Sequence, residues 1–187
     1  MSPRDTAAHD VGTGARRWWI WLLVSAAVIA ADQTSKEWVE SVLRVGEQRA
    51  LTANFSIVLA YNTGAAFSFL ADASGWQRYL FTGLALAASG LMIWLLWRGG
   101  DRVYSLALSL ILGGALGNLW DRLTLGKVVD FLLVHDYLPF RGGLAARFDP
   151  FPAFNVADSA LTVGVALLIL DSFRQHRSDR PAMTSNR

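Results

Sequence analysis

The sequence predicts an all-α integral membrane protein with four membrane-spanning helices and a small sheet at the membrane surface. Of its 187 residues, 53% are hydrophobic and 17% are charged, which is too apolar for an ordinary soluble domain. Four apolar segments follow one another along the chain. The net charge of +2 comes from scattered basic residues, without a basic block, so nucleic acid is not expected as a partner.

The first apolar segment, residues 18–31, has two interpretations. Arg16 and Arg17 precede it, and residues 28–30 could form a small-residue cleavage site, as in a secretory signal peptide. Three later spans and a polar motif directly after the segment favour its retention as a helix. We therefore expect an uncleaved first span over about 17–38.

The remaining spans are expected over about 76–97, 103–121 and 154–173. A hydrocarbon core needs roughly 20 helical residues, so the second and third segments are long enough, whereas the first and fourth must include polar neighbours. The turn at 98–102 separates the middle spans. Residues 55–61 (F-S-I-V-L-A-Y) are rich in β-formers and precede a turn signal, which predicts a small sheet on the membrane surface.

Lys and Arg residues are denser on the side that holds both termini, which favours a cytoplasmic location for the two ends. We expect a single membrane domain over 16–173. Residues 1–15 and 174–187 are polar and are expected to be disordered cytoplasmic ends.

Ionisable residues near the ends of spanning helices are costly unless they are paired or functional. Asp32 and Lys36 are four residues apart, the spacing of a helical ion pair, and a purely structural pair is one interpretation. Asn118 and Arg122 lie on nearly the same face of the third span. One interpretation is that the Arg122 side chain simply snorkels to the membrane interface. The other is that the two residues orient a carboxylate or a substrate carbonyl. Glycines 113, 114 and 117 precede them and predict close helix packing.

Two further acids stand out. Asp130 is flanked by apolar residues just after the third span, and Asp158 is expected at the third position of the fourth helix, with Asn155 as its N-cap. An acid in the first turn of a helix can serve as a cap and nothing else, so this alternative stays open for Asp158.

The sequence offers few residues for other kinds of catalytic site. The chain has no cysteine, no H-E-x-x-H helix and no glycine-rich phosphate loop, and its three histidines lack metal-ligand spacing. We expect neither a metal nor a cofactor. Two carboxylates on the outward side are the best available catalytic groups.

Five motifs occur in order through the spans, and together they resemble the lipoprotein signal peptidases (signal peptidase II) over about residues 16–173. The motifs are D-Q-T-S-K from Asp32, N-T-G-A-A-F from Asn62, G-G-A-L-G-N-L-W-D-R from Gly113, V-V-D-F around Asp130 and F-N-V-A-D ending at Asp158.

The resemblance implies an aspartic endopeptidase of the bacterial inner membrane, with four transmembrane helices, a small extracytoplasmic β-cradle and an active site near the outer face. It implies removal of signal peptides from prolipoproteins by cleavage on the amino side of a diacylglyceryl-modified cysteine. Asp130 and Asp158 match the family's catalytic aspartates. The substrate-binding or supporting residues are then Asp32, Lys36, Asn62, Gly64, Asn118, Arg122 and Asn155.

Prolipoproteins and membrane lipids are the expected partners, and we expect a monomer. The segment 131–153 is longer than is usual for the family, which leaves the loop beside the aspartates undefined. Two other functions stay open. A small transporter or channel would distribute its ionisable groups across the bilayer, and an inactive membrane scaffold would not need both carboxylates.

Overall fold

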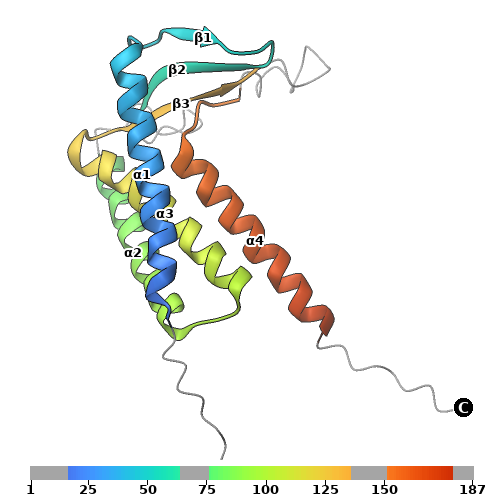
Figure 1. The fold of residues 1–187 in the computed structure, drawn as a ribbon. Coiled ribbons are helices and arrows are strands. Elements are labelled where there is room, and N and C mark those ends of the chain that lie inside the picture. Colours follow the sequence, from blue (N-terminus) through green and yellow to red (C-terminus); the bar gives the residue numbers. More distant parts are fainter. Residues whose placement is uncertain (1–16, 64–75, 136–150, 179–187) are drawn as a thin grey trace, which may run out of the picture.

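The fold is a set of long helices with a small sheet at one end (Figure 1). The computed structural model describes residues 17–63, 76–135 and 151–178. The elements, in chain order, are α1 (Trp19–Val42), β1 (Gln48–Ala50), β2 (Phe55–Asn62), α2 (Trp76–Arg98), α3 (Arg102–Thr124), β3 (Val128–Val134) and α4 (Val156–Ser178).

Three helical segments of the described chain are long and apolar enough to cross a membrane. They are Arg78–Arg98, Arg102–Thr124 and Val156–Arg174. α1 is as long as these, but the D-Q-T-S-K motif lowers its hydropathy. The expected small sheet is present, and α4 continues to Ser178, beyond the boundary expected at 173.

α3 is the central helix and packs against α1, α2 and α4. Its glycine face makes this possible, as the sequence predicts. A Cβ atom on Gly113 would lie 2.7 Å from Cβ of Val28 in α1, and one on Gly114 would collide with the carbonyl oxygen of Ala157 in α4. Only glycine permits these close approaches of the neighbouring helices.

The sheet has the antiparallel order β1-β2-β3. An apolar cluster of Val39, Leu43, Leu59, Val129 and Phe131 packs it against the end of α1. β3 did not emerge from the sequence as a strand, because its near-continuous apolar run follows the third span with only a short turn between them. This placement carries Asp130 to the junction of sheet and helices.

Exposed aromatic side chains gather at both ends of the helices. Those at the sheet end are Trp38, Trp76, Tyr79 and Trp120, and those at the opposite end are Trp19, Trp94, Trp97 and Phe173. Figure 1 shows that the start of α1, the α2–α3 turn and the end of α4 all lie at the end opposite the sheet. Aromatic side chains at two levels are typical of the two interfaces of a bilayer.

Candidate active site

Asp130 lies in the middle of β3, and its side chain is almost completely buried, with 3% exposure. The strand register pairs Asp130 with Ala60 and Val128 with Asn62. Asn62 and Asp130 are therefore diagonal neighbours on one face of the sheet. The Asn62 side chain hydrogen-bonds the Asp130 carboxylate, so the turn motif and the acid predicted from the sequence meet through the sheet.

Asp158 reaches the same place because the chain before α4 is tied to β3. The backbone of Phe154 exchanges hydrogen bonds with Leu132, at 2.8 and 3.0 Å. Asn155 follows as the expected N-cap: its Oδ1 accepts from the backbone N–H of Asp158 at 2.9 Å, and its own N–H donates to Asp158 Oδ2 at 3.2 Å. This reciprocal capping box satisfies two backbone donors at the start of α4.

Two amide side chains bridge Asp130 and Asp158, which we call the aspartate pair. Asn155 Nδ2 donates to Asp130 Oδ1 at 2.8 Å, and Asn118 Nδ2 donates to Asp158 Oδ1 at 2.7 Å. Asn155 Nδ2 also lies 3.1 Å from Asn118 Oδ1, which joins the two amides to each other. Asp158 does cap its helix, but its second oxygen is held by α3 as well, so capping does not exhaust its contacts.

Burial and the neighbouring negative charge of Asp158 raise the pKa of Asp130 to about 7. Burial is the larger cause, and hydrogen bonds from Asn62 and Asn155 and the more distant Lys36 oppose it. Among the described residues, no Lys or Arg forms an ion pair with either member of the aspartate pair. Two carboxylates in such surroundings tend to share one proton near neutral pH.

Lys36 belongs to a second buried polar group, which lies directly beside the aspartate pair. Its Nζ lies 2.7 Å from Asp32 Oδ2, 2.8 Å from Asp121 Oδ2 and 3.1 Å from Asn118 Oδ1. An ammonium group has three hydrogens, and these three acceptors use all of them. Asp32, Lys36 and Asp121 form what we call the lysine cluster, and each is 2% exposed or less.

The lysine cluster contains the expected Asp32–Lys36 pair and one residue that the sequence reasoning missed. Asp121 accepts from Gln33 Nε2 at 2.9 Å and from the backbone N–H of Val129 at 3.1 Å, which links α3, α1 and β3. Its position four residues after Gly117, on the face of α3 turned to α1, was the available signal.

The other predicted site residues are placed as follows. Arg122 donates to the Asn118 carbonyl at 3.2 Å and lies over the ring of Phe81, with 5.5 Å to the centroid. It is close enough to the aspartate pair to interact with it electrostatically. Gly64 lies outside the described residues. Within residues 17–63, 76–135 and 151–178, no cluster of three His, Cys, Asp or Glu side chains could hold a metal ion.

Comparison with known proteins gives a consistent result. The family model for signal peptidase (SPase) II matches residues 24–174. A lipoprotein signal peptidase of Burkholderia ambifaria (strain MC40-6) is 51% identical over 161 residues, covering 86% of this chain and 91% of the relative. The lipoprotein signal peptidase of Pseudomonas aeruginosa is 47% identical over 176 residues, covering 92% and 98%. A solved structure of a bacterial membrane enzyme superposes with a TM-score of 0.73 at 25% identity, covering 89% of this chain and 94% of the other.

Proposed function

This chain belongs to the signal peptidase II family, and we propose that it removes signal peptides from bacterial prolipoproteins with the aspartate pair as its catalytic groups. The substrate is a prolipoprotein that carries a diacylglyceryl-modified cysteine, and the bond cut lies on the amino side of that cysteine. One observation carries the assignment of the catalytic groups. Asp130 and Asp158 come from different elements, are bridged by Asn118 and Asn155, and have no cation paired with them among the described residues.

The mechanism follows from one proton shared by two carboxylates. The ionised member takes a proton from a water molecule, which attacks the carbonyl carbon of the scissile peptide bond. The protonated member donates to the carbonyl oxygen, and the proton taken from water then passes to the leaving amide nitrogen. The elevated pKa of Asp130 supports a pair that holds one proton near neutral pH.

The polar residues around the pair have supporting roles in this proposal. Asn118 and Asn155 fix the orientation of the two carboxylates, and Asn62 limits rotation of Asp130. The lysine cluster in turn holds Asn118 through its Oδ1. We propose that Arg122 binds a substrate carbonyl, because its charge interacts with both carboxylates without forming an ion pair with them.

We further propose that α1 is a fourth membrane span. The aromatic residues Trp19 and Trp38 are separated by roughly 28 Å at 1.5 Å per residue, close to the ~30 Å thickness of a hydrocarbon core. Of the three charged residues of α1 inside this interval, Asp32 and Lys36 are buried and paired, and the exposed Glu37 lies next to Trp38 at the end of the interval. In the inner membrane, both termini would be cytoplasmic and the sheet would face outward.

Exposed apolar side chains on the helices support contact with membrane lipids and with the diacylglyceryl chains of the substrate; examples are Leu23, Leu84, Val163 and Ile169. We propose that one copy of the chain suffices for activity, because both carboxylates and their bridging amides come from the same chain. A polar transport pathway is less well supported, since the charged clusters of α1 and α3 gather at the sheet end.

The direct experiment is incubation of the purified protein in detergent with a diacylglyceryl-modified prolipoprotein. Mass spectrometry should detect release of the signal peptide and a new amino terminus at the lipidated cysteine. The same precursor without its diacylglyceryl group is the matched control and should be cut far more slowly. Equal cleavage of both precursors would contradict the proposed substrate, and cleavage of neither would contradict the function.

Topology can be tested separately with reporter fusions at residue 187 and within β1. The C-terminal fusion should report a cytoplasmic location and the β1 fusion an external one. A mature protein that begins near Ala31 would show that the first segment is removed instead.

A further inference from the structure

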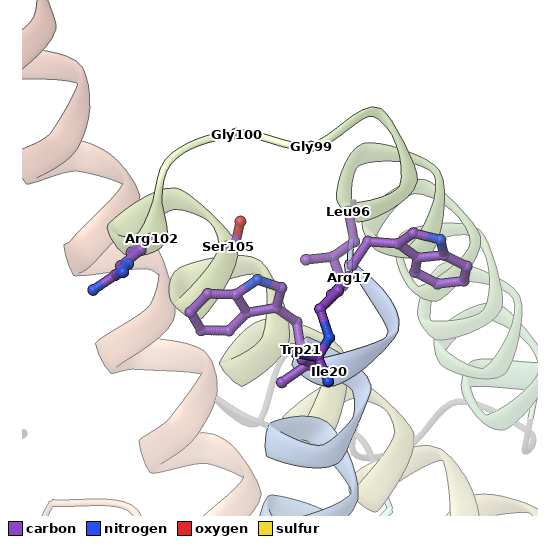
Figure 2. A pocket seen from close by; sticks show the side chains of 9 residues that line it. Arg17, Ile20, Trp21, Leu96, Gly99, Gly100, Arg102 and Ser105 are labelled. Atoms are coloured by element: carbon purple, nitrogen blue, oxygen red, sulfur yellow. The ribbon is translucent and has the colours of Figure 1, made fainter. Parts of the chain in front are cut away.

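A cavity of about 420 Å³ lies where α1 begins and α2 turns into α3, at the end of the helices opposite the sheet (Figure 1) and therefore far from the aspartate pair. Figure 2 shows the cavity from close by. It is bounded by the start of α1, the end of α2 and the turn into α3. The residues that line it are Arg17, Trp18, Ile20, Trp21, Leu96, Gly99, Gly100, Arg102 and Ser105. Nothing in the proposed peptidase chemistry uses this cavity.

Two arginines line the cavity from different elements. Arg17 precedes α1, and Arg102 begins α3. Neither forms an ion pair among the described residues. The acid next to Arg102 has another role, because the Asp101 side chain accepts from the backbone N–H of Tyr104 at 2.8 Å as the N-cap of α3. Arg17 also lies over the Trp19 ring, 5.8 Å from its centroid, so the two arginines bring positive charge to the cavity without a paired acid among the described residues.

The rim of the cavity is held in place by the backbone. Gly99 has a φ of 77°, a left-handed conformation that favours glycine. Its N–H lies 3.0 Å from the carbonyl oxygens of both Leu95 and Leu96, which closes the end of α2. A cavity with a fixed rim loses little conformational entropy when a ligand enters.

The rest of the lining is apolar and aromatic. The indole of Trp21 lies between the labelled arginines in the view of Figure 2, and Leu96 lines the same cavity. The aromatic side chains Trp19 and Trp97, at 50% and 61% exposure, lie at the same level of the helices. Tryptophan at this level is typical of the headgroup region of a bilayer.

We propose that this cavity binds the phosphate of an anionic membrane phospholipid. Guanidinium groups bind phosphate oxygens in a bidentate manner, and basic pockets between helices on the cytoplasmic side are suited to anionic headgroups. A zwitterionic lipid would bring its ammonium group toward the second arginine, whereas a headgroup without that cation would not. The acyl chains would continue along the exposed apolar surface of the helices.

This site rests on the proposed membrane position of the helix ends and is independent of the aspartate pair. Its test needs no prolipoprotein, so a failure here and a failure of the peptidase assignment are distinguishable. The probe is native mass spectrometry of the purified full chain in detergent. An equimolar mixture of phosphatidylglycerol and phosphatidylcholine with identical acyl chains is added.

The wild-type protein should retain phosphatidylglycerol in preference to phosphatidylcholine. Arg102→Gln should reduce that preference about fivefold, and Arg17→Gln with Arg102→Gln should abolish most of it, as expected for one lipid charge interaction per arginine. Arg98→Gln is the matched control. It removes the same charge at the same end, but Arg98 lies over the Trp94 ring, 4.9 Å from its centroid, and does not line the cavity.

Three outcomes would overturn the proposal. The first is an unchanged preference in the double variant, and the second is a loss as large in Arg98→Gln as in Arg102→Gln. The third is displacement of the bound lipid by inorganic phosphate at the same concentration as competing phosphatidylglycerol, which would indicate a general anion site. Phosphatidylglycerol should also raise the melting temperature of wild type and Arg98→Gln more than that of the double variant, which checks that the variants are folded.

Discussion

The aspartate pair and the lysine cluster lie side by side, share Asn118 and differ in one respect. In the lysine cluster, two carboxylates face an ammonium group whose three hydrogens are all used. In the aspartate pair, two carboxylates accept hydrogen bonds from amide groups and form no ion pair with a Lys or Arg among the described residues. A cation fixes both charges of its partners, whereas amides leave the proton free to move between them. The first arrangement suits structure and the second suits acid–base chemistry.

The comparison is tested most strongly by removing charge from the aspartate pair. Asp130→Asn and Asp158→Asn should each lower cleavage of lipid-modified prolipoprotein by ~10²–10⁴-fold or more, because the amide cannot exchange the proton that general acid–base catalysis requires. Turnover is measured in detergent at equal amounts of folded protein. The double variant should be little worse than either single one, since both residues act as a unit. Substantial turnover by Asp158→Asn would indicate that Asp158 is a helix cap and not a catalytic group.

The lysine cluster should respond in stability before it responds in activity. Lys36→Met leaves Asp32 and Asp121 buried without their cation, a change that typically costs ~3–5 kcal/mol. The melting temperature in detergent should fall strongly, and the fraction that stays folded should lose less activity than Asp130→Asn. A triple variant that combines Asp32→Asn, Lys36→Met and Asp121→Asn is the control. It should recover part of the lost stability, and no recovery would contradict the charge argument.

The aspartate pair should also affect how the stability of the protein depends on pH. Burial raises the pKa of Asp130 from 3.8 to about 7, so folding is opposed once the unfolded chain ionises this residue. Stability associated with Asp130 is present below about pH 4, is lost as pH rises to about 7 and then stays level. Asp130→Asn lacks this loss and should exceed wild type in stability above pH 7, by on the order of 2–4 kcal/mol. Thermal unfolding at pH 4 and pH 8 measures the difference. An equal margin at both values would contradict the raised pKa.

The smallest expected effect concerns the contact between sheet and α1, outside both groups. The Tyr61 hydroxyl donates to Glu40 Oε1 at 2.9 Å, and Tyr61→Phe should cost about 0.5–1.5 kcal/mol of stability. Activity should change little, because neither group loses a hydrogen bond. A loss of activity comparable to that of Lys36→Met would indicate that the sheet position controls the aspartate pair more tightly than the contacts imply.

The sequence predicts the long helices, the sheet around 55–61 and the N-cap at Asn155, because each depends on local periodicity or on neighbouring residues. The Asp32–Lys36 pair is predictable for the same reason, since both residues lie on one helix. Asp121 and β3 were missed because their roles depend on contacts between elements. The role of Asp121 depends on its contacts with Gln33, Lys36 and Val129. No local sequence pattern connects these positions.

α1 precedes α3 in the chain, so in the proposed four-span topology Asp32 and Lys36 would enter the bilayer before α3 can supply Asp121 and Asn118. Their spacing on a single helix lets the acid neutralise the base during insertion, which lowers the penalty for placing either charge in hydrocarbon. The ammonium group then still has hydrogens to donate. When α3 packs against α1, Asp121 and Asn118 can accept hydrogen bonds from the Lys36 ammonium group. Because this group needs two acceptors beyond Asp32, it would favour α3 as the partner of α1 and fix the depth at which the two helices pack.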